Sequence, residues 1–540
     1  MDTNPPTSRQ SQLTLKALLL NGMQALCLIC WLAQCVIDSS TDNLLPVTLI
    51  VASTSLVLQY LRLSAAMTTQ PLTAFTLLGF TSSSQFVALV FQTFDWVPMV
   101  QYLRSPMLTF GVLAIVHVTV VLAHFVYRNF APLANIPKVI AVKVLSPLKI
   151  HSIPTPMTVW LMSALGVLAA VMGGGSFGDA GGKFLAGFSF LLWVPYLIPI
   201  YAKIVGPSYC DMKKQYTMLA LYTLVIVAIA LSRNIRSMLL IGPIQLTFLF
   251  VLESCRTAEP VSRRTLKALA VGAITAAIAI PAMSDLAIAM EIAREKRDTS
   301  TAAEVAKETA DIFFDKTRIS QYRAASRGTY INLTYDETYL SNPLFARFTE
   351  TKFHDNMIYF GSLFSEEDRL RLIDNQTDKV KAILPQNVYD ALGIKFNKND
   401  FVFSTGDYYR YIDHGGAFGG FATGSIWADM YVVFGVWFPF VLFVLITVVF
   451  VLMDANGRFD AGHFICPAAL CALWPLYLYG IGGESISFKV NQITRGTLQP
   501  WVLYALVVLS IYAMLQLFRR EAFVSVGTPA PDTKTQPATP

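Results

Sequence analysis

The sequence predicts an all-α, polytopic membrane protein with about twelve transmembrane helices and one large, mostly helical extracytoplasmic loop. Three observations predict this class. Of the 540 residues, 54% are hydrophobic and 14% charged, and the mean hydropathy of +0.51 is too apolar for a soluble chain of this size. Apolar runs long enough to cross a hydrocarbon core of about 30 Å recur along the chain. One segment, Glu291 to Gly424, instead carries 17 of the 41 Lys and Arg and 20 of the 35 Asp and Glu.

The apolar runs define the membrane helices in order along the chain. Nine precede the charged segment and three follow it: 17–37, 44–61, 72–94, 107–127, 157–175, 184–204, 216–232, 237–252, 268–290, 425–453, 463–481 and 500–518. Polar residues at 82–85 interrupt the third run, and Gln245 interrupts the eighth. The first run has no small-residue cleavage pattern after it, so we expect a retained helix instead of a signal peptide.

Lys and Arg are concentrated in cytoplasmic loops of membrane proteins. If the N-terminus is inside, the inner segments collect 18 Lys and Arg and the short outer loops only 6, with Lys489 and Arg495 among the outer ones. Both termini are therefore expected in the cytoplasm and the charged segment outside. The predicted domains are an N-terminal set of helices (1–290), a loop domain (291–424), a C-terminal set of helices (425–518) and a disordered tail (519–540).

Cysteine usage and charge exclude several classes of site. None of the seven cysteines lies in the outer segment, so no disulfide framework is implied. Cys27 and Cys30 have redox spacing, but they lie in an apolar helix with no nearby His or acid. The net charge of +6 comes mainly from inner loops that face anionic lipid, and it does not indicate nucleic acid. No metal-ligand spacing appears among the six histidines, so neither a metal nor a cofactor is expected.

The outer segment is predicted to be helical over 291–316 and 343–392, with Thr349 and Ser365 as helix starts. Its last twenty residues differ, because five glycines between 415 and 424 permit close approach of the backbone to a ligand. Charged and aromatic residues directly precede these glycines: Asp407, Tyr408, Arg410, Asp413 and His414. Such a mixture suits carbohydrate; the alternative is a solvated, glycine-rich connection back into the membrane.

Arginines form a second group of candidates. Arg233 and Arg236 lie one helical turn apart in a short outer turn, where they could present two guanidinium groups to a diphosphate. They could instead reach toward lipid phosphates. Three further arginines follow without sharing one helical face: Arg318, Arg323 and Arg327. These could line a groove, or simply pair with Asp311 and Asp315.

Asp429 is an acid inside an apolar run, which is costly without a partner or water. Intramembrane acids are functional candidates for this reason. A structural ion pair between Asp429 and an Arg from another helix would also offset the cost of burying this acid.

Two motifs resemble bacterial polysaccharide polymerases of the Wzy type, in a superfamily shared with the O-antigen ligases. One is the helix start Ser232-Arg233-Asn234-Ile235-Arg236-Ser237, and the other is the helix Gly424-Ser-Ile-Trp-Ala-Asp429-Met-Tyr431-Val-Val-Phe-Gly435 that follows the large loop. The predicted topology and the size and position of the loop are also similar to that family.

The resemblance implies a metal-independent, inverting glycosyltransferase in the inner membrane, acting on its periplasmic face. Its partners would be polyprenyl-diphosphate-linked donor and acceptor, membrane lipids, a chain-length regulator and a flippase. Such chemistry needs cations beside the leaving diphosphate and a base beside the attacking hydroxyl. The expected roles are diphosphate binding by Arg233, Arg236, Arg318, Arg323 and Arg327, base catalysis by Asp413, His414, Asp407 or Asp429, and sugar binding by Tyr408, Arg410 and Tyr431.

Three other functions are compatible with parts of the sequence. An O-antigen ligase would use the same leaving group with a different acceptor. A glycosyltransferase that uses a lipid-phosphate sugar would place paired acids in the first outer loop, where Asp38 and Asp42 lie in a very short connection. A lipid-linked glycan flippase or other transporter would show internal repeats and charges at mid-membrane, whereas this chain shows no repeated halves and concentrates its charge outside the bilayer.

Overall fold

The computed structural model describes residues 14–172, 184–233, 235, 238–257, 260–293, 301–328, 337, 339–340, 346, 348–384, 386–460, 462–465 and 481–524. Within these residues, eight helical spans are long and apolar enough to cross a membrane: Leu15–Ile37, Thr41–Leu63, Pro71–Phe94, Pro106–Asn129, Phe184–Val205, Met212–Arg233, Ile426–Ala455 and Ile486–Leu517. The prediction of an all-α, polytopic membrane fold is confirmed at this level.

Four of the twelve predicted spans are not among these eight. The run at 157–175 forms a shorter apolar helix, Pro156–Met172. The eighth and ninth runs form long helices, and most of the run at 463–481 lies outside the described residues. The number twelve therefore stays a prediction.

The first half of the chain forms helices joined by short connections. They are α1 (Leu15–Ile37), α2 (Thr41–Leu63), α3 (Ala66–Thr69), α4 (Pro71–Thr81), η1 (Ser82–Phe86), α5 (Val87–Phe94), α6 (Pro106–Asn129), α7 (Ala131–Ile140), η2 (Ala141–Leu145), α8 (Pro156–Met172), η3 (Ser189–Leu197), α10 (Ile198–Val205), α11 (Met212–Arg233), α12 (Met238–Thr257) and α13 (Arg263–Ala293). Thr14 and Ser40 cap the first two helices through their side-chain oxygens.

The polar interruption of the third span is accommodated by hydrogen bonds. Residues 82–86 form a π-helical segment, η1, that joins α4 to α5 without breaking the span. The Ser82 hydroxyl donates to Leu78 O (2.8 Å), and Gln85 Nε2 donates to hydroxyls of α2 at Ser53 (2.7 Å) and Thr54 (3.0 Å). Polar side chains that bond to the backbone or to a neighbouring helix are tolerated in the membrane.

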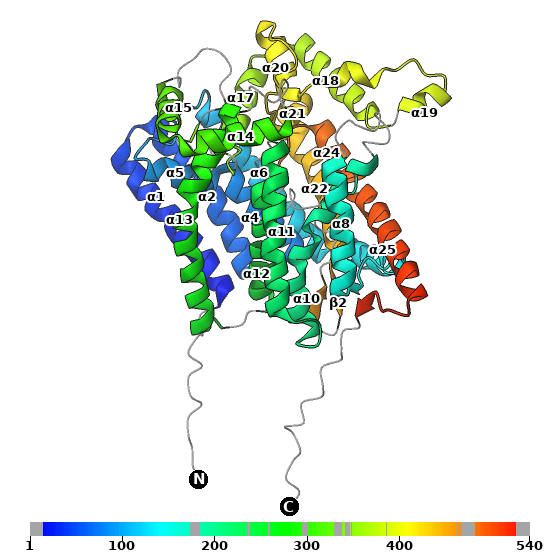
Figure 1. Ribbon diagram of the computed structural model, residues 1–540. Helices are drawn as coiled ribbons and strands as arrows, with labels where there is room; N and C mark the ends of the chain where they lie inside the picture. Colours follow the sequence, from blue (N-terminus) through cyan, green and yellow to red (C-terminus); the bar gives the residue numbers. More distant parts are fainter. Residues whose placement is uncertain are drawn as a thin grey trace, which may run out of the picture.

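The loop helices lie together at one end of the bundle, opposite the first residues of α1 and the last residues of α25 (Figure 1). They are α14 (Ala302–Phe314), α15 (Lys316–Gly328), α17 (Thr351–Ser362), α18 (Glu366–Lys381), α19 (Gln386–Ala391), η5 (Lys398–Phe401) and α20 (Thr405–His414). A capping box on Ser365 starts α18 as the sequence predicted. We call this the outer end.

The outer helices form two units. Ile288, Ile312 and Ile319 make a small apolar core that joins α13, α14 and α15. By contrast, α17 inserts into the main core against η1, α6 and α21. In this contact the Asp355 carboxylate of α17 accepts three hydrogen bonds from the start of α6 and the residues before it. The donors are Ser105 N (2.9 Å), Arg104 N and Thr109 Oγ1. Part of the charged loop is therefore built into the membrane domain.

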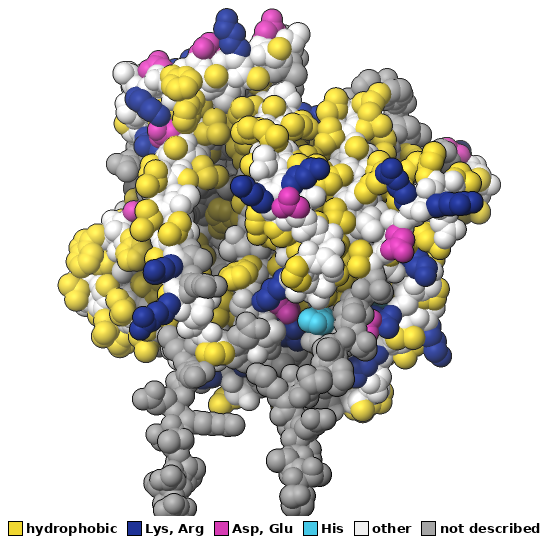
Figure 2. Space-filling view, turned by 60° about the horizontal axis from the view of Figure 1, so that its bottom comes forward, with side chains coloured by type: hydrophobic (Ala, Val, Ile, Leu, Met, Phe, Trp, Pro, Cys, Tyr) yellow, Lys and Arg dark blue, Asp and Glu magenta, His cyan; other side chains and the backbone are white. Residues whose placement is uncertain are grey.

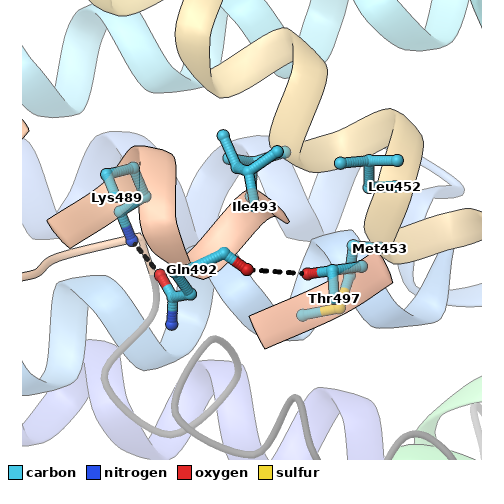
Figure 3. Close-up of a pocket in the computed structure, with 7 residues that line it drawn as sticks. Leu452, Met453, Lys489, Gln492, Ile493 and Thr497 are labelled. Carbon is cyan, nitrogen blue, oxygen red and sulfur yellow. Dashed lines mark hydrogen bonds between the residues drawn. The ribbon is translucent and has the colours of Figure 1, made fainter. Parts of the chain in front are cut away.

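The last helices are α21 (Ile426–Phe434), η6 (Gly435–Trp437), α22 (Phe438–Ala455), α24 (Ile486–Ile493), η8 (Thr494–Leu498) and α25 (Gln499–Leu517). The final span begins at Ile486, earlier than the predicted residue 500, because the Ser485 hydroxyl caps α24. Lys489 and Arg495, expected in an outer loop, therefore lie in this helix. Lys489 is fully buried, and its Nζ donates to Gly482 O (2.6 Å) and to Gln492 Oε1 (2.7 Å; Figure 3).

Short strands lie at the end opposite the outer helices. Strand β2 (Arg458–Asp460) pairs with β3 (His463–Ile465), and β1 (Ile153–Pro154) pairs with β4 (Phe523–Val524), both antiparallel. Lys and Arg side chains are spread over this end of the molecule (Figure 2).

Candidate functional site

Three helix starts converge where the outer helices meet the membrane domain. Ser404, Ser425 and Ser485 cap α20, α21 and α24 respectively. Their backbones pack so closely that a Cβ atom on Gly406 would overlap the Ala422 carbonyl, and one on Gly424 would overlap the Glu484 carbonyl. The glycines are needed for this packing, since any side chain would separate the segments.

Asp407 organises the glycine-rich loop between α20 and α21. Its carboxylate is fully buried and accepts three backbone N–H groups, from Gly419 (3.1 Å), Phe421 (2.9 Å) and Ala422 (2.9 Å). Phe421 adopts a positive φ of 51°, and Gly419 one of 99°, which a chain wrapped around a single carboxylate requires. The residue predicted as a base thus holds the loop in shape.

Asp429 joins the three helix starts. Its Oδ1 accepts the Tyr409 hydroxyl of α20 (3.0 Å), and its Oδ2 accepts Ile486 N at the start of α24 (3.1 Å). Burial and the nearby Asp429 raise the pKa of Tyr409 far above its usual value, so the hydroxyl keeps its proton and donates it in the hydrogen bond. A tyrosine and a backbone amide stabilise this acid in the place of the arginine that the sequence suggested as an alternative.

An open groove of about 230 Å³ lies beside these helix starts, between α18, the segment 401–405 and α24. Its chemistry-bearing lining residues are Lys379, Glu484 and Arg495, with Phe403, Phe488 and Asn491 around them. Arg495 belongs to the π-helical turn η8, a type of distortion often found at functional sites. We call this cavity the outer groove.

Two titratable side chains line the outer groove, Lys379 from α18 and Glu484 from the segment before α24. Lys379 Nζ donates to Phe403 O (2.7 Å) and lies 4.4 Å from the centre of the Phe403 ring. Burial lowers the pKa of Lys379 to about 8, and Asp429, Glu484 and Asp407 oppose this shift. The Glu484 side chain is exposed to the groove, but the protein around it removes enough hydration to raise its pKa, against the effect of Lys379.

The outer groove can therefore stabilise an anion and accept a proton. Lys379, Arg495 and the positive end of α24 suit phosphate oxygens, and Glu484 is a carboxylate whose raised pKa suits a general base. Aromatic rings offer apolar surface for a sugar ring. In the described part of the chain, no three His, Cys, Asp or Glu side chains gather closely enough to hold a metal ion.

Of the predicted sugar-binding residues, Tyr408 contacts the edge of the outer groove. Tyr408 belongs to a cluster of near-parallel rings with Phe403 and Phe418, and Phe403 also lines the groove. Arg410 runs along the glycine loop, where its Nη1 would be 3.3 Å from a Cβ on Gly420. The third predicted sugar-binding residue is Tyr431 on α21, whose ring packs edge-on against Phe438 (6.4 Å). The predicted bases Asp413 and His414 lie on α20, where Asp413 is exposed and His414 is the last residue.

The predicted diphosphate-binding arginines that the structure describes do not line the outer groove. Arg318 pairs with Glu308 (3.4 Å) and Arg323 with Asp285 (2.6 Å), both within the unit of α13–α15. This unit is on the other side of the outer end from α18 and α24 (Figure 1). Arg327 lies within α15, and Arg233 is the last residue of α11. Arg236 lies outside the described residues.

Sequence reasoning missed Lys379, Glu484 and Arg495. Lys379 and Glu484 are more than a hundred residues apart, so only the fold brings them together. One signal was available for Glu484, because Gly482-Gly483-Glu484-Ser485 combines flexible residues with a capping serine, as the first glycine loop does before Ser425.

No model of a known protein family, no curated protein and no solved structure matches this chain.

Proposed function

We propose that this protein polymerises polyprenyl-diphosphate-linked oligosaccharide units into a surface polysaccharide, as a metal-independent glycosyltransferase of a bacterial inner membrane. The outer groove is the observation that carries this proposal, because it joins Lys379, Arg495 and Glu484 at the junction of the outer helices with the membrane domain. Twelve spans, cytoplasmic termini and a periplasmic loop at 291–424 are parts of the same proposal. The basic character of the opposite end supports this orientation (Figure 2).

The lipid-linked diphosphate fits the side of the outer groove formed by α24 and η8. Its oxygens would lie against Lys379, Arg495 and the start of α24, where negative charge grows as the glycosidic bond breaks. Below η8, helix α25 carries exposed apolar side chains on one face, including Val502 (57% exposed) and Leu506 (53%). This face offers the polyprenyl chain a path along the lipid-facing surface.

The acceptor sugar fits beside Glu484. In the proposed step, Glu484 takes the proton from the attacking hydroxyl, the new bond forms between that oxygen and the anomeric carbon, and the bond to the diphosphate oxygen breaks with its electron pair. A single displacement of this kind inverts the anomeric centre. Asp407 and Asp429 act as positioning residues here, since both are fully buried and bonded to the loop and to the helix starts.

The proposal is tested in the native host by deleting the gene and restoring it with variants. Lys379→Met removes one of the two groove cations, while Lys381→Met, at an exposed lysine paired with Asp378 (2.7 Å) on the same helix, is the matched control. On a gel of surface polysaccharide, wild type and Lys381→Met should give long chains and Lys379→Met single units.

Long chains from Lys379→Met, with protein present at normal levels, would remove the outer groove from the mechanism. A deletion strain that still makes long, attached polysaccharide contradicts the polymerase itself. Long lipid-linked chains that accumulate without attachment would identify a ligase instead.

A further inference from the structure

The first turn of α17 carries polar side chains into the interior of the bundle, away from the outer groove. Glu350 N donates to Ser83 O (2.8 Å) and Thr351 Oγ1 donates to Ser84 O (2.7 Å), both in η1 in the middle of the third span. His354 follows one turn later and is 2% exposed. Groups of this kind are costly to bury without partners.

Four buried polar atoms around this turn have no hydrogen-bond partner among the residues that the structure describes: Glu350 Oε2, His354 Nε2, His117 Nε2 and Trp427 Nε1. They are neighbours. His354 Nε2 lies 3.7 Å from Glu350 Oε2, and the His354 ring centre is 6.2 Å from that of Trp427. The Phe80 ring lies 4.4 Å from the His117 ring and 5.1 Å from Trp427. Since buried polar groups are almost always bonded, this cluster indicates a partner beyond the described residues, and ordered water commonly fills that role in protein interiors.

The hydrogen-bonding capacity of the cluster identifies that partner. His117 Nδ1 donates to Leu113 O (2.7 Å), which leaves Nε2 as an acceptor. Ser425 Oγ accepts from Ala428 N, and when its hydroxyl donates to His354 Nδ1 (3.0 Å), the imidazole proton lies on Nε2. With the indole N–H and the carboxylate, the cluster offers two donors and two acceptors. A water molecule can likewise donate two hydrogen bonds and accept two. It can also bridge atoms that are too far apart for a direct hydrogen bond, such as His354 Nε2 and Glu350 Oε2 (3.7 Å).

The titratable groups around Glu350 come from three helices and one connecting segment. Lys489 approaches from α24, Glu484 from the segment before it, and the two histidines from α17 and α6. Burial raises the pKa of Glu350 to about 7, with Lys489 and the Ser83 hydroxyl opposing and Glu484 adding to the shift. Burial lowers the pKa of His354 to about 3, so the imidazole is neutral and a proton bound near neutral pH resides on the carboxyl group.

We infer that Glu350, His354 and His117 form a buried proton-binding site in which ordered water bridges the three side chains. The site is connected to the outer groove through Gly482, where a Cβ would lie 2.5 Å from Glu350 Oε2 and whose carbonyl accepts the Lys489 ammonium (2.6 Å). Protonation of Glu350 removes the negative charge that attracts Lys489. The segment between them continues directly into Glu484, so the proton changes the electric field at the groove.

Lys489 has room for water on its other side as well. A cavity of about 10 Å³, the size of one water molecule, lies against Lys489, Gln492 and Thr497 (Figure 3). The ammonium group also has Gly482 O and Gln492 Oε1 as polar partners when the charge of Glu350 is lost.

Infrared spectroscopy of the full chain in lipid nanodiscs tests the site without any substrate, so its result is independent of the proposed polymerase activity. At about pH 5 we expect the carbonyl stretch of a protonated carboxyl group, which disappears as the pH rises through about 7. Glu350→Gln should lower the amplitude of this band by the contribution of one carboxyl group, and Glu366→Gln, at an exposed glutamate of α18, should leave it unchanged. His117→Phe, which removes one water contact, should shift the frequency of the band.

An amplitude of this band that is unchanged in Glu350→Gln, or the absence of any such band from wild type, overturns the inference. If Glu350→Gln does not fold, His117→Phe decides alone. An unshifted band in that variant shows that no water bridge connects the two residues.

Discussion

Replacing Asp407 with asparagine separates a positioning role from a catalytic one. The Asp407 carboxylate accepts three backbone N–H groups, two on Oδ2 and one on Oδ1. Asparagine has one oxygen, so whichever way the amide turns, its NH₂ group faces at least one of these donors. Hydrogen bonds to a charged group contribute about 1.5–3 kcal/mol each. The variant loses one of these hydrogen bonds, and the remaining ones are accepted by a neutral amide instead of a carboxylate. We therefore expect the folded loop to lose about 2–4 kcal/mol of stability.

Amide hydrogen exchange in lipid nanodiscs measures this loss where it occurs. The free energy corresponds to a rise of about 30- to 1,000-fold in the opening equilibrium of the segment 415–424. The rest of the membrane domain should exchange as in wild type. Asp374→Asn is the control, because Asp374 is an exposed carboxylate on α18.

The opposite result has a clear meaning. If Asp407→Asn abolishes glycan transfer while the loop exchanges at the wild-type rate, the positioning role is refuted. The base predicted from the sequence would then be the better description of Asp407.

Three further predictions follow from other contacts. Transfer should decline as the pH rises above about 8, because Lys379 loses its charge there. The pKa of Lys379 is lower in the folded than in the unfolded chain, so a rise in pH from about 8 toward 10.5 should increase the stability contributed by this group. A pH–rate profile checks the first effect, and thermal unfolding at the same pH values checks the second. Gly424→Ala should lower the melting temperature, since its Cβ overlaps a neighbouring carbonyl at a cost of about 1–3 kcal/mol, whereas Gly22→Ala, with open space around it, should not. Arg323→Ala should cost about 0–1 kcal/mol and leave transfer intact, because its partner Asp285 also pairs with a lysine; lost transfer at unchanged stability would favour the diphosphate role predicted from the sequence.

The membrane spans were largely predictable because apolar runs of sufficient length have few other uses. The third span shows why polar interruptions need not break a helix, since Ser82 and Gln85 find partners in their own turn and in α2. In the last span, charged residues led to a predicted helix that begins too late. Lys489 and Arg495 suggested a loop, but Ser485 caps the helix before them, and Lys489 is stabilised by a backbone carbonyl that only the folded chain provides.

The candidate site was predictable only in part. The sequence pointed to the glycine-rich loop, and the structure places Tyr408 beside the groove and Asp429 at the helix starts behind it. The meeting of Lys379 with Glu484 depends on tertiary contacts between α18 and α24 that no local pattern contains. The insertion of α17 also places Glu350 in the bundle, although the sequence assigned this residue to the outer loop domain.

Purified protein in lipid vesicles, supplied with one defined polyprenyl-diphosphate-linked oligosaccharide unit, tests the central claim most directly. The measured quantity is the length of the lipid-linked glycan over time, for wild type, Lys379→Met and Lys381→Met. We predict a ladder of integral repeats from wild type and Lys381→Met, and a rate about 100-fold or more lower from Lys379→Met, the usual effect of removing one group that stabilises a developing anion. Wild-type protein that binds this unit and never lengthens it would contradict the account.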